Sequence, residues 1–443
     1  MKSMILTLFL SAVVVTLGAA QGLPKEIDAL VDSRFSDDDG IRDRLVEQVT
    51  SGGLTLDALE AAIRGRRAEY PPLAVSLGQL VRDQKLVCDH FDYDTVYHLY
   101  VPKSYDPKRP TSLVVVGHGG NGAMSMERAT RVARDYLSYW VDAAEKHGMI
   151  AVAPATTRGW VAYGNSIMFS LISKLQREFC IDPDRIYVTG HSMGGHLSYR
   201  SGIMFADRFG AIAPKSGGYD YVANEQIVSM FNVPGYATFG KNEPYDINTF
   251  NRTMADWMKG RGYDWKMVEK NGGHEIYKDE IDRQFAFFLE RPRNLYRDRL
   301  EIRCGGSLRQ DRKQEMNPAW DRDHTWNEKR PILLETTHWA RVSPNPDPKL
   351  VQRASIRRTG RSSVDIRCEN LWKLRLYLHP KQFDLEKPLK VVVNGAYREV
   401  VPTVSAQMML DLVREFDDRG RVFRAYVDLT DLPSAPVPLP EVL

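Results

Sequence analysis

Apolar and polar positions alternate along most of the chain, and the period of this alternation changes twice. Residues 25–67 have helical spacing: one run ends at Gly52 and Gly53, and Thr55 is placed as the N-cap of the next. From about residue 88, short apolar runs of strand length alternate with amphipathic segments. This order predicts a mostly parallel sheet with helices on both faces.

The strand-length runs of this second region are residues 95–102, 112–120, 149–155, 186–190, 209–218 and 233–240. Between them, the amphipathic pattern of residues 134–148 predicts one helix that is closed by Gly148. Residues 279–292 carry apolar side chains at helical spacing and end at Pro292, which predicts the last helix of the region.

Beyond about residue 296, short apolar runs are separated by turn residues, among them an Asn394-Gly395 pair typical of a β-hairpin. One helix-like segment, residues 405–418, interrupts them. We expect a β-sandwich-like domain with one helix. The predicted organisation is a signal peptide at 1–20, an N-terminal helical segment at 21–87, a catalytic α/β domain at 88–295 and a C-terminal β-rich domain at 296–443.

The first twenty residues have the three parts of a secretory signal: Lys2, an apolar run, and the small residues Gly18 and Ala20 before the expected cleavage point. An uncleaved anchor is the alternative, but about 15 apolar residues are short for a bilayer span. We therefore expect a secreted or periplasmic protein without a membrane span in the mature chain.

Composition adds few constraints. The 443 residues are 43% hydrophobic, and 60 basic against 57 acidic residues leave a net charge of +3, spread along the chain. No charge pattern for nucleic-acid binding emerges. The cysteines, Cys88, Cys180, Cys304 and Cys368, lack the C-x-x-C spacing of metal sites. A Cys304–Cys368 disulfide is the preferred pairing, and buried free thiols are an equal alternative.

The most specific chemical signal is Gly190-His191-Ser192-Met193-Gly194, a G-x-S-x-G pattern between a predicted strand and a predicted helix. This is the context of a nucleophile elbow, in which glycines permit a tight turn and the serine hydroxyl is exposed above the sheet. The pattern predicts Ser192 as the nucleophile.

A serine nucleophile also needs donors for the oxyanion. The glycine-rich end of residues 112–120 predicts one donor from Gly119 or Gly120, and the N–H of Met193 predicts the other. An ordinary turn at the end of a strand is the alternative for this loop. His118 is expected to shape the loop.

The base must be a histidine downstream of the elbow. His324, His338 and His379 fall in the β-rich tail, which leaves His274, in a glycine-rich loop before the last catalytic helix. His191 is interpreted as the variable residue of the elbow, and His196 as a residue on the following helix.

The third member of the triad is an acid expected about three residues after the strand that ends at Gly240. Glu243 occupies that place, Asp246 is the other candidate, and either could orient the histidine. Trp160 and Tyr163 could line the substrate side, although packing beneath a loop explains these two aromatic residues equally well.

Residues 97–120, 181–195 and 272–290 resemble secreted α/β-hydrolases of the polyhydroxybutyrate depolymerase, feruloyl esterase and dienelactone hydrolase-like type, a group close to prolyl oligopeptidase catalytic domains. The resemblance covers about residues 88–293. It implies an α/β-hydrolase fold in which Ser192 is the nucleophile, His274 the base and an acid follows Gly240.

The chain departs from that pattern at three places. Glu243 stands where aspartate is usual, Phe239-Gly240 replaces a His-Gly pair, and Gly117 stands where a large apolar residue is common. The first two departures concern the acid of the triad, and the third concerns the oxyanion loop.

Together, these features predict a secreted serine esterase that needs no metal or organic cofactor and acts on a small-molecule or polymeric ester. A peptidase of the prolyl oligopeptidase-like type is one alternative, because the same triad cleaves amides. Another is an inactive hydrolase-fold protein whose β-rich tail binds carbohydrate or a surface. The sequence leaves open which ester is cleaved, the oligomeric state and the role of the C-terminal domain.

Overall fold

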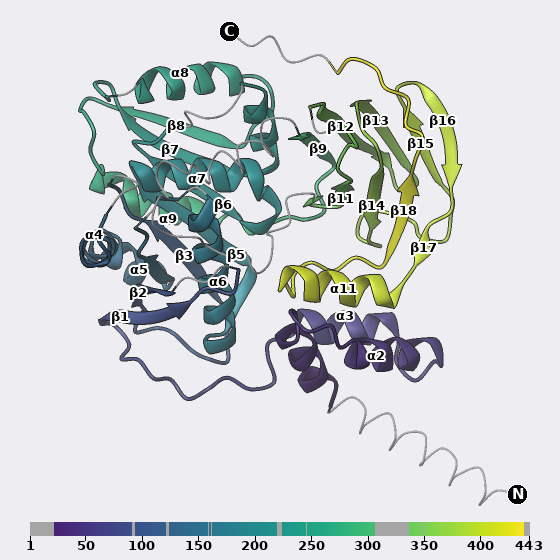
Figure 1. The fold of residues 1–443 in the computed structure, drawn as a ribbon, viewed down its shortest axis with the longest axis horizontal. Coiled ribbons are helices and arrows are strands. Elements are labelled where there is room, and N and C mark those ends of the chain that lie inside the picture. The colour runs from purple at the N-terminus through teal and green to yellow at the C-terminus, as the bar shows by residue number, and fades with distance from the viewer. Residues whose placement is uncertain are drawn as a thin grey trace, which may run out of the picture.

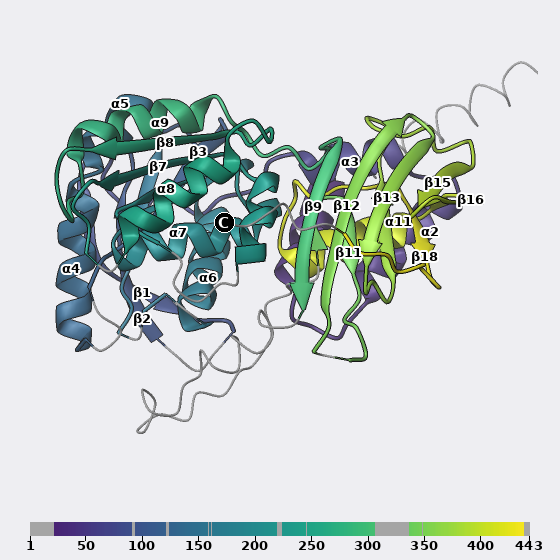
Figure 2. The same cartoon turned by 90° about the horizontal axis from the view of Figure 1, so that it is seen from above.

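The computed structural model describes residues 22–90, 94–120, 124–157, 159–160, 162–218, 224–244, 246–305, 336–347 and 349–437. The predicted signal peptide, residues 1–20, lies outside these ranges. Figures 1 and 2 show an α/β unit and a β-rich unit side by side, with the N-terminal helices next to the β-rich unit. Within the described ranges, no helix is both long and apolar enough to cross a membrane.

The α/β unit is built on one twisted sheet. In spatial order its strands are β1 (Leu80–Val87), β2 (Asp94–Tyr100), β4 (Ile150–Pro154), β3 (Thr111–Gly117), β5 (Ile181–His191), β6 (Ala211–Lys215), β7 (Gly235–Gly240) and β8 (Trp265–Lys270). Neighbours from β4 onward are parallel, whereas β2 is antiparallel to both β1 and β4. This is the α/β-hydrolase arrangement, as predicted.

Helices cover both faces of the sheet because its central strands are apolar on both sides. Val114 and Val116 of β3 pack in the core beneath α4, α5 and α9, whereas Leu113 and Val115 pack in the core beneath α6. The helices are α4 (Met126–Ser138), α5 (Val141–His147), α6 (Ala162–Glu178), α7 (Met193–Met204), α8 (Ile247–Met258) and α9 (Ile281–Leu289).

Two local expectations need correction. The single helix expected over residues 134–148 is two helices, α4 and α5, which break at Tyr139 and Trp140; Gly148 ends α5 in the left-handed conformation, with φ 63°. Strand β1 begins at Leu80, within the segment predicted as helical. It is an edge strand with an irregular register, and four of its eight residues are exposed, so it lacks a continuous apolar run. The domain boundaries otherwise stay a prediction.

The β-rich unit is a sandwich of two sheets, as expected, with strand orders β10-β11-β14-β18-β17 and β16-β15-β13-β12-β9. The bounds are β9 (Arg299–Gly305), β10 (Thr336–Thr337), β11 (Ala340–Val342), β12 (Val351–Gly360), β13 (Ser363–Glu369), β14 (Leu374–Leu378), β15 (Leu389–Val393), β16 (Ala396–Val400), β17 (Thr403–Val404) and β18 (Ala425–Leu429). The predicted hairpin is confirmed: β15 and β16 pair across Asn394-Gly395, both with positive φ.

The preferred disulfide is contradicted by the strand order. Cys304 lies on β9 and Cys368 on β13, and β12 runs between these strands, pairing Gln352 with Cys304 and Ala354 with Cys368. Strands two positions apart are separated by about 9.5 Å, beyond the reach of a disulfide. Cys180 and Cys368 are instead buried free thiols.

The helix α11 (Ala406–Phe416), predicted for residues 405–418, connects the two ends of the chain. Met408, Leu412 and Phe416 pack into the sandwich core. Its other apolar face, with Met409 and Val413, packs against the helix at residues 22–32, α2 (Gly40–Thr50) and α3 (Leu56–Arg64). Figure 1 shows α11 between the sandwich and these helices. The N-terminal helices therefore complete the C-terminal unit.

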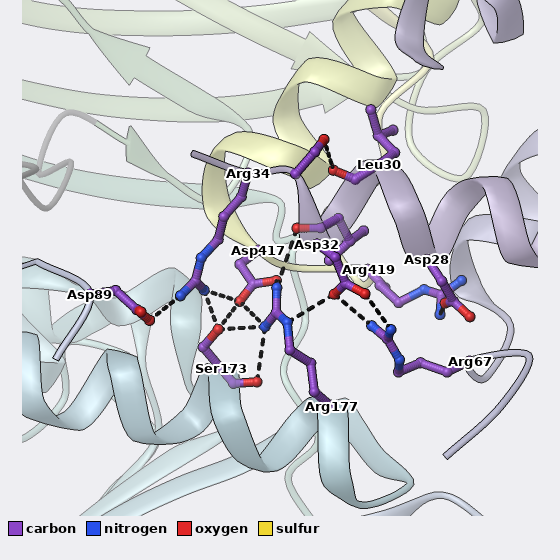
Figure 3. Close-up of polar contacts among 12 residues, drawn as sticks. Asp28, Leu30, Asp32, Arg34, Arg67, Asp89, Ser173, Arg177, Asp417 and Arg419 are labelled. Atoms are coloured by element: carbon purple, nitrogen blue, oxygen red, sulfur yellow. Dashed lines mark hydrogen bonds and ion pairs between the residues drawn. The ribbon is translucent and has the colours of Figure 1, made fainter. Parts of the chain in front are cut away.

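Polar contacts connect this assembly to the α/β unit where the end of α11 meets α6 (Figure 3). Arg177 of α6 bonds Asp417 and Asp32, each at 2.8 Å, and Arg34 contacts both Asp417 and Asp89. Asp417, just after α11, thus pairs with one arginine from the N-terminal segment and one from the α/β unit. Three parts of the chain therefore meet at one carboxylate.

A second, fully buried set of ion pairs lies at the same boundary. Arg293, just after α9, bonds Asp418 at 2.5 and 2.9 Å, and Arg421 bonds Asp207 at 2.7 Å. All four side chains are nearly inaccessible to solvent. Although burial opposes the charge, Arg293 holds the pKa of Asp418 well below its usual range.

Replacing Asp418 by alanine is expected to lower the free energy of unfolding by about 3–5 kcal/mol, because it removes the buried one of the two carboxylates, Asp418 and Asp184, that pair with the buried Arg293. The matched control is Asp428→Ala, which removes an exposed pair with Arg375 and should cost less than about 1 kcal/mol. Calorimetric unfolding of both variants tests this. Equal effects would show that the buried network does not hold the two units together.

Candidate active site

The elbow forms where β5 ends and α7 begins. Ser192 has φ 58° and ψ −118°, a strained backbone for a residue with a side chain, and such strain is typical of functional turns. The turn needs glycine on both sides. A Cβ at Gly190 would collide with the backbones of Gly117 and Gly194, and a Cβ at Gly194 would collide with the backbone of Gly117. This close approach also explains Gly117, which a larger residue could not replace.

His274 connects the two other predicted members of the triad. Its Nε2 lies 2.8 Å from Oγ of Ser192, and its Nδ1 lies 2.6 Å from Oε2 of Glu243. A carboxylate can only accept a hydrogen bond, so Nδ1 carries the proton and donates a hydrogen bond to Glu243. Nε2 is then free to accept the hydrogen bond from the Ser192 hydroxyl. The Glu243 side chain is fully buried, whereas that of His274 is 30% exposed. The histidine therefore lies between a buried carboxylate and an accessible hydroxyl.

Glu243 is held as a carboxylate. Burial opposes its charge, but hydrogen bonds from His274, Ser216 and the N–H of Gly240 outweigh it, so the pKa of Glu243 lies below its usual value. The alternative acid, Asp246, is exposed at the start of α8, and among the described residues it forms no hydrogen bond or ion pair with the histidine. Of the two acids predicted, the structure brings only Glu243 to His274.

The loop after β3 is shaped by His118, as expected. This ring is buried, and burial lowers its pKa to about 4, so it is neutral. Its Nε2 accepts the N–H of Thr156 at 3.0 Å, and its Nδ1 therefore donates to the carbonyl of Gly119 at 2.8 Å. The His118 side chain thus connects the backbone of the predicted oxyanion loop to Thr156, just after strand β4.

The predicted oxyanion donors lie around the elbow. Met193 is the first residue of α7, where a backbone N–H has no acceptor within the helix. Gly120 is exposed with φ 123°. Gly119 is buried, and its backbone hydrogen-bonds the phenol of Tyr136, whose pKa is nevertheless raised by burial. Which of these groups would bind an oxyanion stays a prediction.

The two aromatic candidates for the substrate side differ. Trp160 is only 1% exposed and its indole N–H donates to the carbonyl of His118 at 2.9 Å, so it packs beneath the oxyanion loop. This favours the packing alternative over a substrate contact. The side chain of Tyr163 lies outside the described part of the chain.

One neighbour of His274, and that neighbour's own partner, were not predicted from the sequence. His191 was interpreted only as the elbow's variable residue, but its ring lies 4.7 Å from that of His274, and its Nδ1 is 3.1 Å from the Tyr136 hydroxyl. Burial, and then His274, lowers the pKa of His191 to about 4. No local motif marks these contacts, because Tyr136 comes from α4.

No metal-binding group of three or more His, Cys, Asp or Glu side chains occurs in the described ranges. Comparison with family models gave no match. Curated relatives match part of the chain. It is 27% identical over 146 residues to the bifunctional acetylxylan esterase/xylanase XynS20E of Neocallimastix patriciarum, covering 31% of this chain and 20% of that protein.

Feruloyl esterase C of Emericella nidulans is 30% identical over 128 residues, which cover 28% of this chain and 46% of the relative. The chain thus spans less than half the length of these curated relatives. A thermostable esterase of known structure superposes with a TM-score of 0.39 at 22% identity, covering 47% of this chain and 64% of the other. The sequence relatives and the sheet order support an α/β-hydrolase of an esterase-like group.

Proposed function

We propose that the protein is a secreted serine hydrolase that cleaves carboxylic esters through an acyl-enzyme. The single observation that carries the proposal is the bridging position of His274, with Ser192 at 2.8 Å and Glu243 at 2.6 Å. A hydroxyl in contact with a neutral imidazole, itself oriented by a carboxylate, is the arrangement that activates a serine nucleophile.

In the first half-reaction, Oγ of Ser192 attacks the ester carbonyl and Nε2 of His274 takes the hydroxyl proton. The carbonyl oxygen becomes an oxyanion, which backbone N–H groups near Met193 and Gly120 would stabilise. Collapse of the tetrahedral intermediate breaks the bond to the alcohol, and the imidazolium returns its proton to the leaving oxygen.

In the second half-reaction, a water molecule attacks the acyl-enzyme and gives its proton to the same nitrogen. His274 then returns that proton to Oγ of Ser192 as the carboxylic acid departs. Glu243 stays ionised throughout and stabilises the imidazolium, which its lowered pKa supports. The cycle consumes one water per ester and needs no cofactor.

The substrate proposal comes from the partial relatives. Because the names of two of them specify acetylxylan and feruloyl esters, we propose acetyl or feruloyl esters of a saccharide as the substrate class. Secretion is proposed from the signal-like pattern of residues 1–20. A polymeric substrate outside the cell would be consistent with both.

An ester panel tests the proposed function. We expect purified protein to hydrolyse p-nitrophenyl acetate and methyl ferulate with kcat/KM at least about 100-fold above that for chromogenic proline peptides, because the partial sequence relatives are esterases. Hydrolysis is followed by product absorbance. Preferred cleavage of the peptides would assign the peptidase alternative, and cleavage of neither class would assign an inactive binding protein.

A further inference from the structure

One lysine lies beneath the candidate active site without any described ion-pair partner. Lys215 ends strand β6, and its side chain is completely inaccessible to solvent. It shares a sheet face with Ala211 and Ala213, whose small side chains pack in the core under α9. The long side chain of Lys215 follows these two small residues on the same face and reaches Tyr277, in the segment that follows His274.

The ammonium group is poorly satisfied for a buried charge. Among the described residues, the carbonyl oxygen of Tyr277 is its hydrogen-bond partner, at 3.5 Å. The nearby carboxylate of Glu280 is already bound by Tyr236 at 2.8 Å and Lys270 at 3.1 Å. Burying an ammonium without a paired carboxylate costs stability. Lys215 thus lowers the stability of the fold, which a residue with a purely structural role would not be expected to do.

Lys215 contacts both halves of the site. Its backbone carbonyl accepts the N–H of Ser192 at 3.0 Å. Its ammonium bonds the carbonyl of Tyr277, which has a left-handed backbone with φ 50°. The Tyr277 phenol in turn donates to the carbonyl of Gly273, the residue before His274, at 2.5 Å. A chain of contacts thus runs from the nucleophile elbow to the histidine loop.

We propose that Lys215 is a positioning residue that holds the loop of His274 in register with Ser192, through Tyr277. This inference rests on the proposed function of the triad and goes beyond it, because Lys215 touches neither the substrate nor the reacting atoms. A loop displaced by a fraction of an ångström would lengthen the contact between Nε2 of His274 and Oγ of Ser192, and so slow proton transfer.

The test separates positioning from folding by the sign of two effects. Lys215→Met is expected to lower kcat on p-nitrophenyl acetate by about 10-fold or more with KM unchanged. The same variant should have an unchanged or higher Tm, because it removes a buried charge. Amide hydrogen exchange of residues 271–277 should become faster, an observation that does not depend on activity.

A second variant tests the proposed route through Tyr277. Tyr277→Phe removes the phenol contact with Gly273 and should also lower kcat at constant KM. If both side chains act through one loop, the double variant should be no slower than Lys215→Met, because the effects of coupled residues do not add. Lys146→Met is the matched control: this lysine is 63% exposed, pairs with Asp282, and should leave every readout unchanged.

The difference in stability between Lys215→Met and the wild type should also depend on pH in a defined direction. Burial lowers the pKa of Lys215 from 10.5 to about 7. The negative charges of Glu280 and Asp279 oppose this shift, and the positive charge of Lys270 adds to it. His191 is the other titratable neighbour, and Lys215 contributes to its lowered pKa. The folded chain therefore releases this proton more readily than the unfolded chain.

The penalty for the buried ammonium is complete below about pH 7 and disappears as the pH rises toward 10.5. The Tm advantage of Lys215→Met over wild type should accordingly shrink across that range. If wild type neither hydrolyses esters nor reacts with a fluorophosphonate, the proposed function fails and this inference with it. An active wild type with an unaltered kcat in Lys215→Met, or with kcat and Tm falling together, would overturn the inference alone.

Discussion

Replacing Ser192 by alanine is expected to reduce kcat on p-nitrophenyl acetate by about 10⁴- to 10⁶-fold, because no other group can form the acyl-enzyme. The remaining rate would come from binding and from the oxyanion donors. Spectrophotometric turnover at saturating substrate measures the effect. Alanine keeps the Cβ and therefore the backbone strain at φ 58°, so the variant should keep the stability of the wild type.

A useful control for this variant is Ser198→Ala, which removes a buried hydroxyl of α7 that bonds the carbonyl of Gly194. Ser198 lies six residues after Ser192 on the same helix, and its replacement should leave kcat nearly unchanged. Comparable losses in the two variants would mean that the helix, and not the nucleophile, had been damaged. Retention of full activity in Ser192→Ala would exclude Ser192 as the nucleophile.

Replacing Glu243 by glutamine is expected to reduce kcat by about 10⁴-fold. An amide at this position can donate to Nδ1 of His274, which then loses its proton there and presents Nε2–H to the serine. The histidine in this tautomer cannot act as a base. The side chain is fully buried and 2.6 Å from Nδ1, so solvent cannot substitute for the lost charge.

Asp246→Asn is the matched control for Glu243→Gln. Asp246 lies three residues further along the same loop but is exposed, and its replacement should change kcat by less than about twofold. Both variants are compared by kcat on the same ester and by Tm. A large loss in Asp246→Asn together with a small one in Glu243→Gln would transfer the role of the acid to Asp246.

The parts of the site that the sequence predicted are those encoded locally. The glycines around Ser192 mark a turn in which backbones approach closely, and that constraint is visible in a few consecutive residues. His274 and Glu243 follow strand ends of a parallel sheet, which meet at one edge of the sheet. Chain order and topology were therefore enough to bring them together as candidates.

The rest depends on contacts between distant segments that no local pattern reveals. Tyr136 reaches His191 from α4, and Lys215 reaches Tyr277 from the neighbouring strand end. Strand β12 lies between the strands that carry Cys304 and Cys368, and this separation contradicts the pairing preferred from the sequence. The contacts of the N-terminal helices with α11 and the residues that follow it likewise join distant positions, such as Ile63 and Arg419, which are 356 residues apart.

Ser192 is reactive in the proposed mechanism because His274 accepts its proton. The most direct measurement is reaction with a fluorophosphonate, followed by mass spectrometry of the labelled peptides, for wild type and for His274→Ala. We expect one adduct per chain, on Ser192, and labelling at least about 10³-fold slower in the variant. An adduct on another residue, or equal rates in the two proteins, would contradict the account.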